Sequence, residues 1–158
     1  MNNNPLPPIK RLTMAEAHYI DHVCRIQVDV IGRILFHGLL KSTKAPSGSG
    51  LVSRLKKFFT LKTERKFTET QLNNVQKMIH HCTTFLSCVM SLASITRRID
   101  MGDLTPEEVS GLERRYTLIC EEIEVLYNAI KTADYGNNRY IDGAFWQIHH
   151  LYHEALRP

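Results

Sequence analysis

Apolar residues recur at intervals of three and four along four long stretches of the chain, the spacing that places them on one face of an α-helix. We therefore expect helices near residues 14–41, 69–100, 106–132 and 139–156. None of these stretches alternates between apolar and polar residues in the way that a half-buried strand does. The pattern predicts an all-α fold.

Three of these helices begin with a sequence signature for a helix N-terminus. In each case a threonine is followed three residues later by Glu or Gln, the pattern of a capping box in which side chains and backbone N–H groups bond reciprocally. The three pairs are Thr13 with Glu16, Thr68 with Gln71, and Thr105 with Glu108. These signals agree with the helix starts that the apolar spacing predicts.

The apolar positions of each helix form a heptad-like seam, which is typical of helices that cross at a shallow angle. The turns DMGD and DYGNN are short, so the last three helices are expected to be antiparallel neighbours. The sequence thus predicts one four-helix bundle over residues 13–158, preceded by a disordered tail over residues 1–12. Representative seam residues are Ile20, Cys24, Ile31, Val75, Ile79, Leu86, Tyr116, Ile119, Ile123, Phe145, Ile148, Tyr152 and Ala155.

The second predicted helix carries more apolar surface than one seam requires. Phe85, Leu92, Ile95 and Ile99 belong to a further three-and-four series, about a third of a turn from the seam. Such a stripe is expected where a bundle helix contacts two neighbours, where it binds a partner or a second copy of the chain, or where a connecting segment covers it. All three interpretations stay open, and the four residues are candidate interface residues.

The connection between the first two helices, residues 42–67, holds the protein's excess of positive charge. Residues 41–66 contain eight Lys or Arg and one acid, a balance of +7, whereas the rest of the chain contains twelve Lys or Arg and fifteen acids. Within the connection, residues 51–59 combine apolar residues at helical spacing with basic residues between them. This pattern predicts a short amphipathic helix of about nine residues.

This basic connection allows three interpretations. In the first, its apolar side docks on the bundle and its charges are only solvated. In the second, it binds phosphates or an acidic protein surface, and in the third it lies on an anionic membrane. A nine-residue helix without an acyl chain holds a membrane weakly, so the membrane is the least favoured partner. The residues expected to contact a polyanion are Arg54, Lys56, Lys57, Lys62, Arg65 and Lys66.

Two histidine pairs have the i, i+4 spacing at which one helix face can chelate a metal ion, His18 with His22 and His149 with His153. The first pair lies on the polar side of its helix, and no Glu-x-x-His motif supplies carboxylate ligands, so we predict no metal site. The second pair follows the only tryptophan, Trp146, on the flank of an apolar face. Tryptophan is over-represented in binding hot spots, so Trp146, His149 and His153 are either candidate interface residues or the rim of the bundle.

Composition places the chain among soluble globular proteins, with 43% hydrophobic and 23% charged residues. The four cysteines show no C-x-x-C spacing and three fall on apolar helix faces, which favours a reducing cytoplasm. No G-x-S-x-G, H-E-x-x-H, phosphate-loop or dinucleotide-binding motif is present. We therefore expect no catalytic residues, no cofactor and no small-molecule substrate.

The sequence favours a non-enzymatic cytoplasmic adaptor or accessory protein. On this hypothesis, the basic connection and an apolar or aromatic surface bind a protein partner or a second copy of the chain. The alternative is a nucleic-acid-binding accessory protein, in which residues 41–66 contact RNA or DNA phosphates while the bundle oligomerises. A metal-binding helical protein is the third hypothesis.

Overall fold

Four helices account for most of the described part of the chain, which in this computed structural model comprises residues 6–42, 66–133 and 139–158. These ranges contain no strand. The predicted all-α class with four helices is confirmed, and the helix boundaries lie within a few residues of those expected. The helices are α1 (Met14–Ser42), α3 (Lys66–Asp100), α4 (Pro106–Thr132) and α5 (Arg139–His150), which continues into a short π-helix, η2 (Leu151–Ala155).

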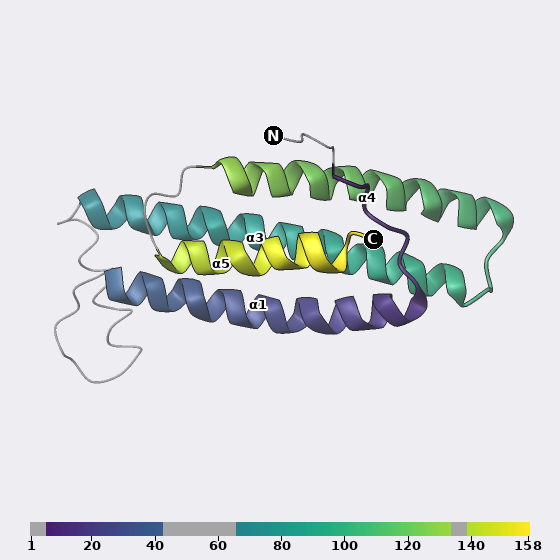
Figure 1. Cartoon of the computed structure of the whole chain (residues 1–158), viewed down its shortest axis with the longest axis horizontal. Coiled ribbons are helices and arrows are strands. Elements are labelled where there is room, and N and C mark those ends of the chain that lie inside the picture. The colour runs from purple at the N-terminus through teal and green to yellow at the C-terminus, as the bar shows by residue number, and fades with distance from the viewer. Residues whose placement is uncertain (1–5, 43–65, 134–138) are drawn as a thin grey trace.

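The helices lie alongside one another, and successive helices run in opposite directions along the long axis of the molecule (Figure 1). α3 packs against α1 and α4. α5 packs mainly against α1 and also contacts α3 and α4. The end of α4 and the start of α5 therefore lie at the same end of the molecule as the end of α1 and the start of α3.

The three predicted capping boxes have different outcomes. The hydroxyl of Thr105 accepts from the N–H of Glu108 at 3.3 Å, and the carboxylate of Glu108 accepts from the N–H of Thr105 at 2.8 Å, so this box is complete. Thr13 accepts from the N–H of Glu16 at 3.2 Å, at the start of α1. α3 already begins before Thr68, so the prediction of an N-cap at that residue is wrong.

The turn between α3 and α4 depends on a glycine. Gly102 has a φ of 79°, a left-handed conformation that residues with a Cβ rarely adopt. Its N–H donates to the carbonyl of Ile99 at 3.2 Å, and the N–H of Met101 donates to the carbonyl of Arg97 at 3.1 Å, which ends α3. The chain can therefore reverse within a few residues and enter α4 at Pro106.

An apolar core fills the contacts between the helices. Burying one Leu, Ile or Phe side chain contributes roughly 1.5–3 kcal/mol, so the core is the main force that packs the helices together. Its largest fully buried side chains are Tyr152, Phe85, Ile20, Leu35, Met78, Leu86, Leu92, Ile123, Ile130, Ile148, Leu156 and Val75.

The second apolar series of α3 lies in the chain's own core. Phe85 and Leu92 are fully buried, Ile95 is nearly so, and Ile99 packs against the same cluster. A helix that contacts α1, α4 and α5 needs a wide apolar stripe. This corrects the expectation of a partner interface at Phe85, Leu92 and Ile95, since these side chains are covered within one chain. Ile99 is only partly buried, and its role at an interface stays a prediction. Ile79, expected in the first seam, is instead 40% exposed.

The π-turn at the end of α5 changes which residues face the core. An i to i+5 turn holds one more residue than an α-turn, which shifts the phase of the side chains that follow. Leu151, Tyr152 and Leu156 are buried, whereas Ala155, which was expected in the seam, is only partly buried. Phe145, also expected in the seam, is only partly buried as well, but it lies before the π-turn, which does not explain its position. The three-and-four spacing of apolar residues therefore does not predict the buried positions correctly in the last turn.

α5 is shorter than its neighbours, and the N-terminal segment covers part of the surface beyond it. At about 1.5 Å per residue, the 12 residues of α5 span about 18 Å and the 27 residues of α4 about 40 Å. Residues 6–13 cross from α4 to the start of α1 beside the C-terminus (Figure 1), and the N–H of Lys10 donates to the carbonyl of Leu156 at 2.9 Å. The prediction of a disordered tail is therefore wrong for residues 7–12, while residues 1–5 lie outside the described residues.

The basic connection lies almost entirely outside the described residues. The predicted amphipathic helix falls there, as do Arg54, Lys56, Lys57, Lys62 and Arg65. Lys66 is the first residue of α3. The expected roles of these residues stay predictions.

One helical stretch in the described part of the chain, Asn73–Asp100 of α3, is long and apolar enough to cross a membrane by length and composition. The core helix of a soluble protein meets the same criterion. Here the stretch contributes Val75, Phe85 and Leu92 to the core and contacts the other three helices.

The substitution Ile123→Ala is expected to lower the free energy of unfolding by about 2–5 kcal/mol, because it leaves a cavity at a fully buried position. Ile26→Ala is the matched control, since it removes the same atoms from a side chain that is 47% exposed, and should cost less than about 1 kcal/mol. Urea unfolding followed by circular dichroism measures both. Equal losses would contradict the assigned core.

The substitution Leu92→Glu is expected to unfold the chain, because it places an unpaired carboxylate in the core. Leu118→Glu, at a side chain that is 63% exposed, should keep the helical circular dichroism signal. Light scattering with circular dichroism separates unfolding from dissociation. A folded Leu92→Glu variant with a smaller mass than the wild type would restore the interface interpretation.

Candidate interaction site at the C-terminal helix

Trp146, His149 and His153 gather on the flank of α5 and η2 that faces α4. They follow one another at i, i+3 and i+7, so they share one side of the helix. The ring of Trp146 meets His149 edge-on with 5.0 Å between centroids, and the imidazoles of His149 and His153 lie 4.2 Å apart. We call these three residues the histidine face. The structure thus brings together the three candidate residues of the last helix.

Tyr127 of α4 binds both histidines through its hydroxyl. Its Oη lies 2.6 Å from Nδ1 of His149 and 3.1 Å from Nε2 of His153. A phenol has one proton, so it donates to one imidazole and accepts from the N–H of the other. The two histidines therefore have different hydrogen-bonding roles when both are neutral.

The partly buried position of this cluster favours uncharged side chains. Burial lowers the pKa of His153 from its usual 6.5, and the neighbouring charges of His149 and Arg157 lower it further. Burial raises the pKa of Tyr127. At neutral pH both His153 and Tyr127 are therefore neutral, and the hydrogen bond between them does not require a charge.

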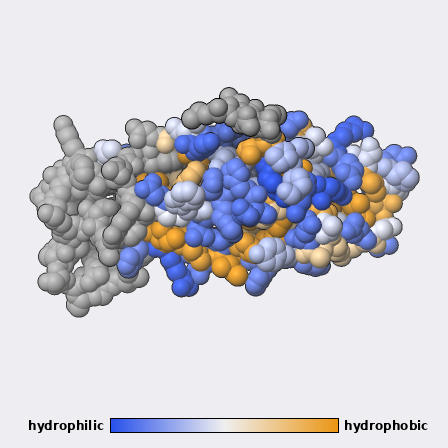
Figure 2. Space-filling view, viewed as in Figure 1, coloured by the Kyte–Doolittle hydropathy of each residue, from blue (hydrophilic) through white to orange (hydrophobic). Residues whose placement is uncertain are grey.

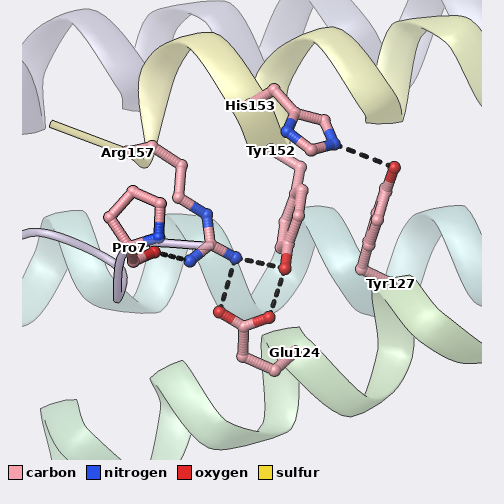
Figure 3. A network of polar contacts seen from close by, with 6 residues as sticks. All are labelled: Pro7, Glu124, Tyr127, Tyr152, His153 and Arg157. Carbon is pink, nitrogen blue, oxygen red and sulfur yellow. Dashed lines mark hydrogen bonds and ion pairs between the residues drawn. The ribbon is translucent and has the colours of Figure 1, made fainter. Parts of the chain in front are cut away.

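A polar network beside the histidine face joins both ends of the chain to α4 (Figure 3). Nη2 of Arg157 donates to Oε1 of Glu124 at 2.6 Å and to the hydroxyl of Tyr152. Nη1 of Arg157 donates to the carbonyl of Pro7, and the hydroxyl of Tyr152 donates to Oε2 of Glu124. We call Pro7, Glu124, Tyr152 and Arg157 the terminal network.

The terminal network compensates a buried charge. Arg157 is only 6% exposed, and its guanidinium lies over the ring of Tyr152 at 4.4 Å from the centroid. Burial and the hydrogen bond to Glu124 raise the pKa of Tyr152, so its hydroxyl stays a donor at neutral pH. Nε of Arg157 is buried without a hydrogen-bond partner. A buried guanidinium depends strongly on the partners that remain, because an unpaired charge in the protein interior is costly.

Aromatic stacking connects the terminal network to the histidine face. The rings of Tyr127 and Tyr152 lie 3.7 Å apart and within 8° of parallel. Phe145 stacks on Tyr127 at 6.3 Å. Tyr127 therefore contacts the histidines through its hydroxyl and the terminal network through its ring.

Tyr116 of α4 makes a second attachment to the N-terminal segment. Its hydroxyl donates to the carbonyl of Lys10 at 2.9 Å and accepts from the N–H of Leu12 at 3.1 Å. Arg11 lies over the same ring at 4.6 Å and pairs with Glu113 at 3.1 Å. Sequence reasoning missed both attachments, and the only signal for them was an apolar Leu12 at the end of a segment expected to be disordered.

The four thiols are not activated for nucleophilic chemistry. Burial raises the pKa of Cys24 and Cys82 to about 12 and that of Cys120 to about 11. Burial also raises the pKa of Cys88. A thiol is a weak nucleophile until it loses its proton, so these cysteines are mostly protonated and weakly nucleophilic at neutral pH.

The described residues contain no group of three or more His, Cys, Asp or Glu side chains that could hold a metal ion. His149 and His153 are both bound to Tyr127. In this arrangement the two imidazoles pack against each other and form hydrogen bonds with Tyr127.

Large exposed apolar side chains are spread over several helices. On the face drawn in Figure 2, small hydrophobic patches alternate with hydrophilic side chains. Tyr19 and Ile26 of α1 and Leu118 and Val125 of α4 are among these exposed residues. Trp146 differs from them because neighbouring rings hold it in place, with Phe145 at 6.1 Å and His149 at 5.0 Å.

No protein-family model, curated protein or solved structure matches the chain.

The substitution Arg157→Met is expected to lower the free energy of unfolding by about 3 kcal/mol, because it leaves the Pro7 carbonyl and Oε1 of Glu124 without their donor. Arg33→Met is the matched control, since Arg33 pairs with Asp29 at 2.8 Å on the surface and should cost at most about 1 kcal/mol. Urea unfolding measures both. A similar small loss for the two variants would mean that the terminal network contributes little to stability.

The stability of the chain is expected to fall as the pH is lowered through 6.5. The pKa of His153 is lower in the folded chain than its usual 6.5, so the unfolded chain binds the proton more readily and acid favours unfolding. In His153→Gln the loss of stability between pH 7.5 and 5.5 should be smaller. It should not vanish, because burial lowers the pKa of His81 as well. Urea midpoints at a series of pH values test this, and identical pH profiles for wild type and variant would contradict it.

Proposed function

We propose that this chain is a non-enzymatic adaptor protein of the cytoplasm, in which a four-helix bundle presents two binding elements to a macromolecular partner. One element is the histidine face with Trp146 at its exposed end. The other is the basic connection over residues 41–66. The heptad-like seams, the buried core and the reversal of direction between successive helices support the bundle arrangement.

The main support for this proposal is the exposed position of the only tryptophan. Trp146 is 61% exposed, although tryptophan is usually highly buried. Contacts with Phe145 and His149 already restrict its ring, so binding orders it at little further cost in side-chain entropy. A large rigid aromatic side chain at the surface is the kind of residue that dominates binding energy in protein interfaces.

The chemistry of the remaining polar groups supports binding over catalysis. The thiols are protonated at neutral pH, since burial raises their pKa. Glu124 and Arg157 are engaged with each other and with both chain ends, and so hold the fold together. An acid or base for catalysis must instead reach a bound substrate.

The basic connection supports a partner with negative charge. Its balance of +7 is concentrated between the end of α1 and the start of α3, whereas the rest of the chain has a balance of −3. Such a local excess attracts acidic protein surfaces and speeds their association. It also suits phosphates, so the alternative function is an accessory protein that contacts RNA or DNA through residues 41–66.

The adaptor proposal is tested by capturing partners from a lysate of the source cells with the full chain and with Trp146→Ala. The variant is expected to recover at least about tenfold less of a specific partner, the size of effect typical of a hot-spot residue. Leu118→Ala, an equally exposed apolar residue on α4, should recover as much as the wild type. Unchanged recovery by Trp146→Ala would remove the histidine face from the proposal.

A salt titration separates the two functions. If the connection binds nucleic acid, affinity for RNA or DNA should fall steeply with salt, and Lys56→Glu with Lys57→Glu should reduce the slope of log K against log salt by about 1–2. If it binds an acidic protein, the wild type should bind the captured partner in a salt-dependent way and hold RNA, DNA and anionic vesicles poorly at the same ionic strength. Binding to none of them at low salt would leave the connection without a binding role.

A further inference from the structure

A groove between α3 and α4 lies near the turn that joins these two helices. Its volume is about 140 Å³. The lining residues are Ser91, Ser94, Ile95 and Arg98 of α3 and Leu112 and Arg115 of α4.

The two helices place one arginine on each wall of this groove. The lining residues of α3 lie at i, i+3, i+4 and i+7 and therefore share one face of the helix. Ile95 and Leu112 pack against the core and form an apolar floor. Arg98 and Arg115 are exposed above it. The groove thus combines a hydroxyl-bearing helix face with a guanidinium group from either side.

Most arginines in the described part of the chain have a carboxylate within ion-pair distance, but those of the groove do not. Among the arginines whose side chains the structure describes, which leave out Arg139, the three without such a partner are Arg98, Arg114 and Arg115, and two of these line the same groove. The arginines that do form ion pairs are Arg11, Arg25, Arg33, Arg97 and Arg157.

The carboxylate of Glu108 has a hydrogen-bond partner outside the groove. Glu108 is close enough for its charge to interact with that of Arg98, but its carboxylate accepts from the N–H of Thr105 at 2.8 Å within the capping box. The adjacent Arg97 points the other way and pairs with Asp21 of α1 at 3.4 Å. Neither Arg98 nor Arg115 therefore forms an ion pair with an acidic side chain of the described residues.

We propose that this groove binds a single phosphate monoester group, either as inorganic phosphate or on a small phosphate ester. Guanidinium groups carry several N–H donors in a planar fork that matches phosphate oxygens, and the exposed Ser94 adds a hydroxyl donor. The volume of about 140 Å³ is well below the roughly 300–1,000 Å³ of pockets that enclose a drug-sized ligand. The groove therefore takes the phosphate group, and the rest of an ester would lie outside it.

Charge favours a monoester over a diester. A phosphate monoester carries about 1.5 to 2 negative charges at neutral pH, which the guanidinium groups of Arg98 and Arg115 balance. A phosphodiester of a nucleic acid carries one negative charge and would leave half of this positive charge uncompensated. The lining residues include none of the histidine face and none of residues 41–66, so the proposal goes beyond the proposed function and is tested independently of it.

The test uses the full chain, with inorganic phosphate and phenyl phosphate as probes at constant ionic strength. Amide resonances in two-dimensional NMR are expected to shift saturably around residues 91–98 and 112–115. Arg98→Gln and Arg115→Gln should each weaken binding by about tenfold or more, because each removes charge-assisted hydrogen bonds. Arg114→Gln is the matched control, since it removes the same charge one residue away from the groove and should weaken binding less than about twofold.

Each outcome decides the proposal. Saturable binding of inorganic phosphate alone would identify free phosphate as the ligand of the groove. Binding of both probes would identify a phosphate ester as the ligand. Shifts that do not saturate, or equal weakening by Arg114→Gln and Arg115→Gln, would show general electrostatic attraction and overturn the site. Dimethyl phosphate binding as tightly as phenyl phosphate would overturn the assignment to monoesters. The variants should keep the wild-type melting temperature within a few degrees, since exposed charges contribute little to folding.

Discussion

The charge of Arg157 has to be compensated inside the protein, and much of the structure follows from how this is done. Its partners come from three places that are distant in sequence: Glu124 on α4, Tyr152 in the last helical turn and the carbonyl of Pro7. Because all of them converge on one guanidinium, the N-terminal segment and the C-terminus are both fixed against α4 (Figure 3). The short α5 would otherwise leave apolar surface open beyond its end. The N-terminal segment closes part of that surface with the buried side chain of Leu12.

The same arrangement determines the candidate binding surface. Tyr152 stacks on Tyr127, and Tyr127 in turn bonds to both histidines. The ring of His149 then restricts Trp146, so the exposed tryptophan is supported by a series of contacts that begins at the buried guanidinium of Arg157 and its ion pair with Glu124. This is why we favour a binding role, in which a rigid support presents an aromatic side chain at the surface. The groove between α3 and α4 lies outside this chain of contacts, and its charge points to a second, smaller ligand.

How much of this could be predicted depends on how local each feature is. Helices and the cap at Thr105 follow from spacing and from hydrogen bonds over three or four residues, so the sequence shows them directly. The stripe at Leu92 was ambiguous, because an apolar face has the same pattern whether a neighbouring helix or another molecule covers it. The bond from Arg157 to Pro7 joins residues separated by 150 positions, and no local pattern reveals it. Trp146, His149 and His153 could be grouped by helical spacing, but Tyr127, which holds them, lies on another helix.

Native-state hydrogen exchange of residues 7–12 measures whether the terminal network holds this segment as part of the folded domain. The amides of Lys10 and Leu12 donate to Leu156 and Tyr116, at 2.9 Å and 3.1 Å. We expect their exchange to be slowed at least about a hundredfold relative to an unstructured peptide, with protection that Arg157→Met strongly reduces. Exchange of both amides at the rate of an unstructured peptide in the wild type would contradict the account, since the N-terminal segment would then not be held by α4 and the C-terminus.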